Sequence, residues 1–361
     1  MNTYLPASHV ETHRAPSIDV DQTEYDRFLD GFAASPGAAL AYHHPFYLRF
    51  LTEVAYPGST PRLLMSRNPR GRLTGVLPGV HVMTPRLNVW LSLAYFGPNA
   101  GALVPPDRVS DLEALVRAAE SDAIERGCGS LTLYTPLGVS SEPYRRALGG
   151  VDFELPRESQ WMALPQNLDV SPWPAKVRYY ARRAALRGVT VRAIADEREL
   201  DVIWDIYRER CELKSIPIKP RDHIRTLFRT AGRHGIFLLA EHDGRIAAGL
   251  ICLVGGGVIS YYLPCARSDA RHLRPSLLLL DRAVAIGRRD AGCRVLNFEA
   301  SPKVGGSVYQ FKTECGGKPV SYRVLVKLLR PGVLDEYRAL EPDGLRREAP
   351  QAFVVPFEAL T

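Results

Sequence analysis

Two stretches of this chain resemble each other and decide its fold: residues 115–136 read LVRAAESDAIERGCGSLTLYTP, and residues 280–302 read LDRAVAIGRRDAGCRVLNFEASP. In each stretch a Gly-Cys pair separates an amphipathic run from an apolar run. Glycine is common just after the last turn of a helix, where the backbone becomes left-handed. We therefore predict, in each copy, a helix that ends at the glycine and leads into a buried strand.

A second pair of similar stretches lies upstream: residues 63–78 read LLMSRNPRGRLTGVLP, and residues 236–253 read IFLLAEHDGRIAAGLICL. Each predicts two strands joined by a tight polar turn. Because both pairs occur in the same order at nearly the same interval, we interpret them as an internal duplication. Each copy then has a mixed α/β pattern in which an antiparallel hairpin leads into parallel strands. This order of elements resembles the GNAT acyltransferase fold.

The remaining patterns complete two tandem GNAT-like domains. A predicted helix at 196–213 opens the second copy, and a helical stretch at roughly 24–54, interrupted near 35–37, opens the first. A basic helix at roughly 173–187 lies between the copies. The predicted parts are a disordered tail at 1–16, an N-terminal GNAT-like domain at 17–170, a C-terminal GNAT-like domain with the basic helix at 171–335, and a C-terminal extension at 336–361.

Composition narrows the class of protein. The chain has 361 residues, 46% of them hydrophobic and 24% charged, which is typical of globular proteins of two domains. Residues 1–16 lack the apolar core of a secretory signal, and the uncharged stretch at 246–263 is interrupted by three glycines, which favours two strands over a membrane helix. The six cysteines lack metal-ligand spacing. We therefore expect a cytoplasmic protein with reduced, buried cysteines and no metal.

The net charge of +7 is concentrated in the second half of the chain, while the first half is slightly acidic. A basic half favours a partner rich in phosphate. Attraction between an acidic and a basic half would produce the same pattern. Charge alone leaves both interpretations open.

Three stretches resemble the FemAB-like group, which includes the FemX-type aminoacyltransferases of tandem GNAT domains. They are PAKVRYYARRAALRGVTV at 174–191, RPSLLLLDRAVAIGRRDAGCRVLNFEAS at 274–301 and VYQFKTECGGKP at 308–319. The resemblance implies transfer of an aminoacyl group from aminoacyl-tRNA, as co-substrate, to an amine with formation of an amide bond. The acceptor would be a small biosynthetic metabolite or a peptidoglycan precursor. No other cofactor is implied.

The loops that precede the two crossing helices bear on the acyl donor. Ordinary GNAT enzymes hold the CoA pyrophosphate with an R/Q-x-x-G-x-G/A loop at a helix N-terminus. Here the loops read GPNAGALVPPDRVS at 97–110 and CARSDARHLRPS at 265–276, and neither has this motif. This favours aminoacyl-tRNA. Acyl-CoA remains an alternative donor, and a GNAT pair that only binds RNA or a partner, without catalysis, is a further alternative.

Acyl transfer to an amine needs a neutral nucleophile and donors for the developing oxyanion. Lys312 follows Phe311 in a predicted strand, and the resemblance implies a cation over the reacting carbonyl or the terminal tRNA phosphate. Phe311 is either a core residue or a platform for the terminal adenine. Glu299 ends a predicted strand, where the family more often has Gly or Asp. Its carboxylate would orient or deprotonate the amine, or else pair with Lys303 or an arginine.

The candidate substrate-binding residues are basic or aromatic. Arg178 and Arg182 share a face of the basic helix and suit a phosphate, although carboxylates from the acidic half would also neutralise them. Tyr262 ends a strand beside the expected cleft, where neighbouring side chains point to opposite faces. Arg274 lies where CoA enzymes have glycine, together with Arg267 and Arg271, and is the candidate there for a phosphate contact.

Overall fold

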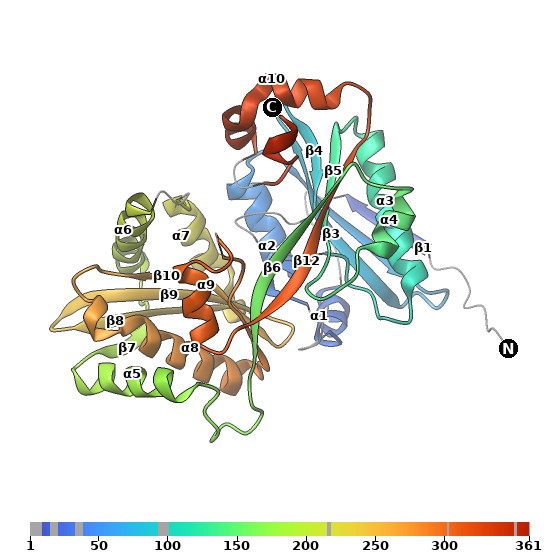
Figure 1. Ribbon diagram of the computed structural model, residues 1–361. Coiled ribbons are helices and arrows are strands. Elements are labelled where there is room, and N and C mark those ends of the chain that lie inside the picture. The colour runs from blue at the N-terminus through green and yellow to red at the C-terminus, as the bar shows by residue number, and fades with distance from the viewer. Residues whose placement is uncertain are drawn as a thin grey trace. The chain divides into compact units, whose positions relative to one another are not determined.

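The computed structural model describes residues 9–14, 21–32, 39–92, 101–214, 218–301, 303–349 and 352–360 (Figure 1). The chain forms two compact units: Met1–Glu158 with Ser321–Thr361, and Ser159–Val320. This division differs from the predicted boundaries at 170 and 335. The reason is that the chain enters the second unit within strand β6 (Phe153–Ala163) and returns to the first within strand β12 (Lys318–Leu328).

The first unit is built on a sheet with the strand order β1-β2-β3-β4-β5-β12. The strands not yet defined are β1 (His9–Arg14), β2 (Thr60–Arg67), β3 (Leu73–Met83), β4 (Asn88–Leu91) and β5 (Ser130–Tyr134). Only the β4–β5 pair is parallel among these neighbours. Residues 9–14 of the tail predicted to be disordered at 1–16 instead form strand β1, whose backbone pairs along β2.

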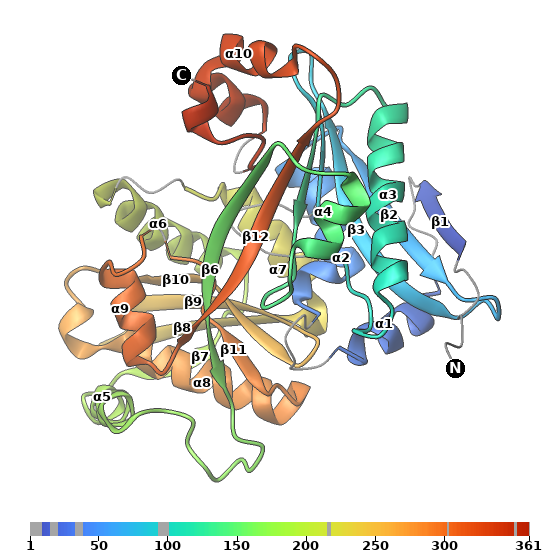
Figure 2. The ribbon, with the colours of Figure 1, turned by 45° about the vertical axis from the view of Figure 1, so that its right-hand side comes forward.

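Helices accompany this sheet, and α3 and α4 lie side by side next to its strands (Figure 2). The helices are α1 (Gln22–Asp30), η1 (Ala41–His43), α2 (Pro45–Phe50), η2 (Leu51–Ala55), α3 (Val109–Glu125), α4 (Glu142–Leu148), α10 (Val333–Glu348) and η5 (Phe357–Ala359). The helical stretch predicted at 24–54 is thus split into α1, η1, α2 and the beginning of η2. Its predicted interruption near 35–37 lies outside the described residues.

The second unit is built on a sheet with the strand order β6-β11-β10-β9-β8-β7. Its further strands are β7 (Thr190–Ala193), β8 (Gly235–His242), β9 (Arg245–Gly255), β10 (Val258–Ala266) and β11 (Val295–Asn297). Its helices are α5 (Ala175–Leu186), α6 (Glu197–Leu213), α7 (Arg221–Thr230), η3 (Gly232–His234), η4 (Arg271–Leu273), α8 (Pro275–Ala291) and α9 (Ser307–Glu314). Helices α5 and α8 cover one face of the sheet, and α6 and α7 cover the other (Figure 1).

The predicted duplication is confirmed by the topology. Both hairpins form, as β2–β3 and β8–β9, and both crossing helices connect a parallel pair, β4–β5 through α3 and β10–β11 through α8. Gly127 and Gly292 adopt φ of 66° and 60° after α3 and α8, the left-handed conformation that the glycine signal predicts. The mixed α/β fold with two tandem GNAT-like units is therefore as the sequence indicates.

Close packing fixes α8 against the sheet of the second unit. A Cβ at Gly287 would lie 2.4 Å from the Ile259 side chain, so only glycine lets α8 approach β10 this closely. The indole of Trp173, before α5, donates to Asp281 on α8 at 2.7 Å. The N-terminus of α8 is thereby held in a fixed place relative to β10 and α5. All six cysteines are buried and unbridged.

Within the described ranges, no helix is both long and apolar enough to span a membrane. A search of the same residues finds no cluster of His, Cys, Asp and Glu that could hold a metal ion.

A buried charge cluster holds the first unit together. Arg62, with no exposed surface, forms a two-pronged ion pair with Asp122, and the Trp90 indole donates to the same carboxylate at 3.0 Å. Burial alone would raise the pKa of Asp122, but the hydrogen bonds and charge of Arg62, with Trp90 and Arg126, outweigh it and hold the pKa below its usual value. The carboxylate therefore stabilises the fold at neutral pH.

Replacing Asp122 with Asn should lower the stability of the first unit by about 3–5 kcal/mol at pH 7, because the buried Arg62 loses its counter-charge. The loss should shrink as the pH falls through the lowered pKa of Asp122, where the wild-type carboxylate also becomes neutral. Urea unfolding at several pH values measures both effects. Glu142→Gln, which breaks an exposed pair with Arg145, is the control and should cost less than about 1 kcal/mol. Equal losses in the two variants would contradict the role given to Asp122.

Candidate active site

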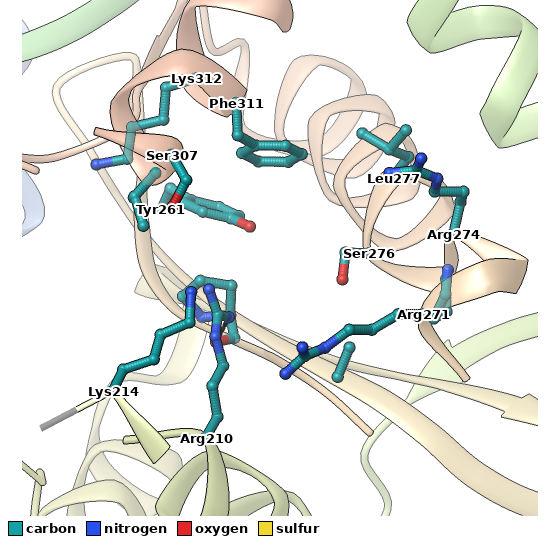
Figure 3. A pocket seen from close by; sticks show the side chains of 14 residues that line it. Arg210, Lys214, Tyr261, Arg271, Arg274, Ser276, Leu277, Ser307, Phe311 and Lys312 are labelled. Atoms are coloured by element: carbon teal, nitrogen blue, oxygen red, sulfur yellow. Dashed lines mark hydrogen bonds between the residues drawn. The ribbon is translucent and has the colours of Figure 1, made fainter. Parts of the chain in front are cut away.

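A cavity of about 470 Å³ opens at the N-terminus of α8 in the second unit (Figure 3). Its walls come from the end of α6, strand β10, the beginning of α8 and helix α9. Five of the lining residues are basic: Arg210, Lys214, Arg271, Arg274 and Lys312. None of the described residues that line it is acidic. The cavity is therefore suited to an anionic ligand.

The basic residues lie close enough to influence one another. The pKa of Lys214 is lowered from its usual value by burial and by the charges of Arg210 and Arg271. Arg210 donates one hydrogen bond to the Pro264 carbonyl at 3.1 Å, which holds its side chain across the cavity wall. Arg210 and Lys214 were not predicted, although their spacing of four residues places them on one face at the end of a long helix. Repulsion among these cations would be relieved by a bound phosphate.

The loop before α8 uses its own backbone amides. The amides of Leu273 and Arg274 donate within the η4 turn, to Ala270 and Arg271, and the Leu277 amide donates back to Arg274. Pro275, the first residue of α8, has no N–H. A glycine-rich GNAT loop presents such amides to phosphate. Here at least three of the amides are engaged within the turn, and the side chains of Arg271 and Arg274 line the cavity beside it.

Arg274 has an unusual conformation. Its backbone is left-handed, with φ 60° and ψ 40°, which is uncommon for a residue with a side chain. Its guanidinium lies 5.2 Å from the centroid of the Tyr180 ring on α5, within cation–π range. Arg274 therefore lies at the cavity, as the prediction of a phosphate contact requires. Arg267 does not, because its guanidinium donates to the Ile246 carbonyl at 2.8 Å.

Lys312 lies on helix α9, so the predicted strand at this position is wrong. Val308, Phe311 and Cys315 recur at the spacing of a helix, and the glycine-rich turns on either side bound it. The Lys312 ammonium donates to the carbonyls of Glu299 and Ala300 at 2.8 and 2.9 Å. Burial lowers its pKa to about 8, against the opposing effect of Glu299. Its side chain runs away from the centre of the cavity, whereas Phe311 faces it (Figure 3).

Glu299 lies two residues after the end of β11 and is not among the residues that line the cavity. Its backbone has φ 61°, a strained value for a residue other than glycine. Asn297 forms hydrogen bonds with both the side chain and the backbone of Glu299. The Asn297 Nδ2 donates to Glu299 Oε1 at 2.9 Å, and the Glu299 amide donates to Asn297 Oδ1 at 3.0 Å. Lys312 thus contacts the Glu299 carbonyl, and Asn297 contacts its carboxylate.

The two tyrosines on β10 point to opposite faces, as alternation predicts, but the candidate residue Tyr262 is not the one that lines the cavity. Tyr261 lines the cavity, and Tyr262 points to the other face, where the Lys219 ammonium lies 4.9 Å from its ring centroid. A bulge in β10 at these residues contributes to this arrangement. Lys219 is buried, which lowers its pKa to about 8. Nothing in the sequence pattern singled out Lys219.

The predicted phosphate pair on the basic helix lies outside this cavity. Arg178 and Arg182 project from α5 into solvent and do not line the cavity, and within the described ranges neither has a hydrogen-bond or ion-pair partner. The expected neutralisation by carboxylates is therefore not observed for these two residues. Arg183 and Arg187 instead line a smaller cavity beside Arg274.

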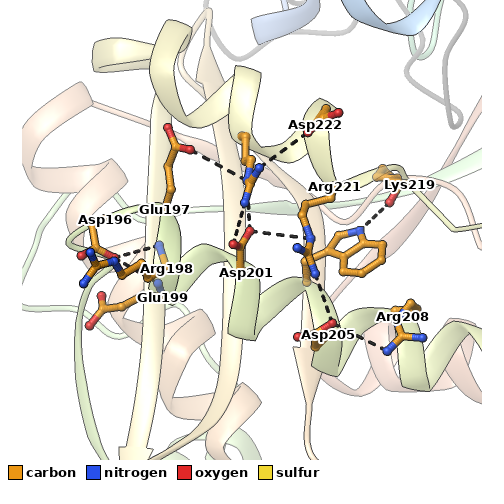
Figure 4. A network of polar contacts seen from close by, with 12 residues as sticks. Asp196, Glu197, Arg198, Glu199, Asp201, Asp205, Arg208, Lys219, Arg221 and Asp222 are labelled. Atoms are coloured by element: carbon orange, nitrogen blue, oxygen red, sulfur yellow. Dashed lines mark hydrogen bonds and ion pairs between the residues drawn. The ribbon is translucent and has the colours of Figure 1, made fainter.

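Ion pairs between α6 and α7 position the basic end of α6 (Figure 4). Arg225 on α7 forms a two-pronged pair with Asp201 on α6, at 3.0 and 2.6 Å. The Arg221 guanidinium stacks 4.7 Å from the Trp204 ring centroid, and the Trp204 indole donates to the Lys219 carbonyl at 2.9 Å. This network fixes the position of α6 and of the buried Lys219.

Residues 175–313 match a family model described as an acetyltransferase (GNAT) domain, a range that contains every residue lining the cavity. No curated protein matches the chain. Among solved structures, the chain is similar to FemX, with a TM-score of 0.68 and 13% identity over 87% of this chain and 96% of that one.

It is also similar to a tandem GNAT protein from the clavulanic acid biosynthesis pathway, with a TM-score of 0.54 and 16% identity over 90% of this chain and 100% of that one. A third similar structure is L-PGS from Bacillus licheniformis, with a TM-score of 0.52 and 13% identity over 91% and 95%. These likenesses confirm the predicted tandem GNAT fold and the resemblance to FemX-type proteins. The family match agrees with the prediction of an acyltransferase enzyme.

We expect inorganic pyrophosphate to raise the thermal midpoint of the protein, because a ligand that binds only the folded state stabilises it. An Arg271→Gln/Arg274→Gln variant should lose this shift, since the cavity then lacks two of its five cations. An Arg178→Gln/Arg182→Gln variant has the same net charge and should retain it. Differential scanning fluorimetry at low salt gives the comparison. Equal shifts in all three proteins would show that the anion binds elsewhere.

Proposed function

We propose that this protein is an aminoacyltransferase that takes an aminoacyl group from aminoacyl-tRNA and joins it to an amine acceptor. The observation that carries the proposal is the cationic cavity at the start of α8, which five basic side chains line and whose preceding loop has no glycine. A donor of this kind implies that the enzyme works in the cytoplasm. The acceptor would be a small biosynthetic amine or a peptidoglycan precursor.

The cavity suits the 3′ end of an RNA better than the pyrophosphate of CoA. Arg271 and Arg274 would hold phosphodiester oxygens, to which guanidinium groups can bind with two hydrogen bonds each. Tyr261 and Phe311 supply aromatic surface in the same cavity, on which a base can stack. The glycine loop that would cradle a pyrophosphate with backbone amides is replaced by the η4 turn.

The reaction needs little chemical assistance, because an aminoacyl ester is already activated and positioning supplies much of the rate. The neutral amine attacks the ester carbonyl, and the new C–N bond forms as the carbonyl oxygen becomes negative. Collapse of this intermediate breaks the bond to the ribose oxygen, which leaves with a proton, while the amine loses one. The net products are an amide and deacylated tRNA.

Lys312 is assigned to stabilise the oxyanion. An ammonium has three N–H donors, and two of them hold the carbonyls of Glu299 and Ala300. The third would meet the carbonyl oxygen of a donor whose acyl end extends from the cavity toward Glu299 and Ala300, the carbonyls that the Lys312 ammonium contacts. Glu299, oriented by Asn297, is assigned to orient the amine or accept its proton.

Purified protein should bind bulk charged tRNA with an affinity that falls steeply with salt, because phosphate contacts release counterions. It should bind acetyl-CoA weakly or not at all. Filter binding across a salt series, followed by transfer of a radiolabelled amino acid to a panel of amines, tests both points. Tight acetyl-CoA binding without tRNA binding would support the acyl-CoA alternative. Binding of tRNA with no transfer to any acceptor would favour a non-catalytic protein.

The rate of transfer should fall as the pH rises above about 8, where Lys312 loses its proton. Stability should change in the opposite direction: the pKa of this lysine is about 8 when folded and near 10.5 when unfolded, so the unfolded chain binds more protons between these values and stability rises with pH there. Rate and unfolding midpoint measured from pH 7 to 10 separate the two effects.

Lys312→Met should lower kcat by about 10²–10³-fold, the typical effect of losing one oxyanion donor. Lys312→Arg keeps its charge to much higher pH, so the alkaline loss of rate should move upward. Lys219 also has a pKa of about 8, and this shift distinguishes the two lysines. An unchanged pH profile in Lys312→Arg would remove Lys312 from the assigned role.

A further inference from the structure

The cavity at the start of α8 continues along α5 through two smaller cavities. A connecting space of about 70 Å³ shares Arg274, Leu277 and Phe311 with the main cavity. An outer cavity of about 230 Å³ shares Tyr180 and Arg274 with the connecting space. Arg274 therefore lines all three. The three cavities are thus neighbours that follow one another from the start of α8 to the outer end of α5, and we refer to them together as the path.

The path is basic throughout. The outer cavity is lined by Arg183, Arg187, His272 and Arg274 together with Tyr180 and Leu273, and none of these is acidic. The one acidic residue in the connecting space is Glu314, whose charge is matched by Lys176 at 3.0 Å. A ligand that fills the path must therefore carry negative charge both at the start of α8 and some distance along α5.

Aromatic side chains alternate with these cations. Tyr180 lies beneath the Arg274 guanidinium, and Arg183 lies 5.9 Å from the ring centroid of Tyr179, to whose hydroxyl it donates at 3.0 Å. Tyr179 is 55% exposed, which leaves its ring open to stacking. Alternating cations and exposed rings are typical of surfaces that bind single-stranded nucleic acid, because bases stack on the rings and phosphates meet the cations.

Arg274 and Arg187 fix the junction of the path. Arg274 keeps a left-handed backbone that most residues avoid, and this conformation places one guanidinium at the meeting point of the three cavities. Arg187 donates to the His272 carbonyl at 3.3 Å, which ties the end of α5 to the loop before α8. The two groups of cations thus have a fixed spacing.

We propose that Tyr180, Arg183, Arg187, His272 and Arg274 form a track for the single-stranded RNA that precedes the terminal nucleotide of the donor. This inference rests on the proposed use of aminoacyl-tRNA and adds a second phosphate subsite to it. Arg183 and Arg187 hold phosphodiester groups of the strand, and Tyr179 and Tyr180 stack on its bases. Arg178 and Arg182, on the solvent-facing side of the same helix, take no part.

The test uses a six-nucleotide single-stranded RNA that ends in CCA and carries no amino acid. Its dissociation constant is measured by fluorescence anisotropy from low to moderate salt for the wild type, Arg183→Gln/Arg187→Gln and the matched control Arg178→Gln/Arg182→Gln. The track variant should bind at least about tenfold more weakly at low salt. Its salt slope should be smaller by about 1.4, which corresponds to two single-strand phosphate contacts at about 0.7 each. The control should match the wild type.

Equal weakening in the two double variants would show only a general effect of charge and would overturn the track, as would no weakening in either. If the track variant loses acetyl-CoA binding but keeps RNA binding, the subsite belongs to a CoA phosphate, and the RNA assignment is overturned. Unfolding midpoints of all three proteins confirm that they are folded.

A transfer assay separates failure of this inference from failure of the proposed function. Charged tRNA is compared with a minimal donor, the 3′ aminoacyl ester of adenosine monophosphate, which lacks the preceding nucleotides assigned to Arg183 and Arg187. The track variant should lower kcat/KM for charged tRNA at least about tenfold more than for the minimal donor. Equal effects on the two donors would overturn the track while transfer itself stands. If no protein transfers from either donor, the proposed function fails, and the RNA-binding comparison still decides the track.

Discussion

Five cations share one cavity without an acid among its described lining, and the second unit has to hold them there against their repulsion. Contacts outside the cavity stabilise the helices that carry these cations. The Asp201–Arg225 pair binds α7 to α6, whose end carries Arg210 and Lys214. On the other side, the close approach of α8 to β10 at Gly287 fixes the helix that Arg274 precedes. Repulsion among these cations lowers the stability of the folded protein, and an anionic ligand relieves it on binding. The same charges therefore contribute to the affinity for the ligand.

The two copies of the fold have cavities of different character, so the cationic lining is a property of the second copy's residues and not of the fold itself. The repeat aligns α3 with α8, and a cavity of about 520 Å³ lies at the N-terminus of α3 in the first unit. Its wall there is formed by Pro105, Pro106 and Val109, and Arg27 is the one charged residue among those described that line it. Two copies of one fold thus carry an apolar and a cationic cavity at corresponding positions. Function follows the loop residues that each copy acquired.

The parts of the fold that could be predicted from sequence are those with strong local signals. The hairpins follow from turn residues such as Gly71 and Gly244, and the crossing helices follow from periodicity closed by Gly127 and Gly292. The unit boundaries could not be predicted, because β12 returns to pair with β5 and no local pattern records that pairing. The pattern at α9 predicts a strand because its eight residues are too few for periodicity to distinguish a helix from a strand.

The residues that line the cavity were harder to predict from sequence than the elements of the fold, for a related reason. Arg178 with Arg182 and Arg183 with Arg187 both satisfy the i,i+4 rule, and only the packing of α5 against α8 selects the second pair. In the same way, alternation along β10 places one of Tyr261 and Tyr262 at the cavity without saying which. Arg210 and Lys214 become part of the site only when the end of α6 meets the start of α8. Each of these choices is made by contacts between elements distant in sequence.

The cationic cavity also bears on the nucleophile. An amine must lose its proton before it attacks, and a positive charge nearby disfavours the ammonium form. The lowered pKa of Lys214 beside Arg210 and Arg271, to which burial contributes most, shows this effect on a group of the protein itself. An acceptor amine brought toward Lys312 would experience the same field. In the proposed reaction, the residues assigned to the donor phosphates would then also favour the neutral amine, which reduces the demand on Glu299 as its proton acceptor.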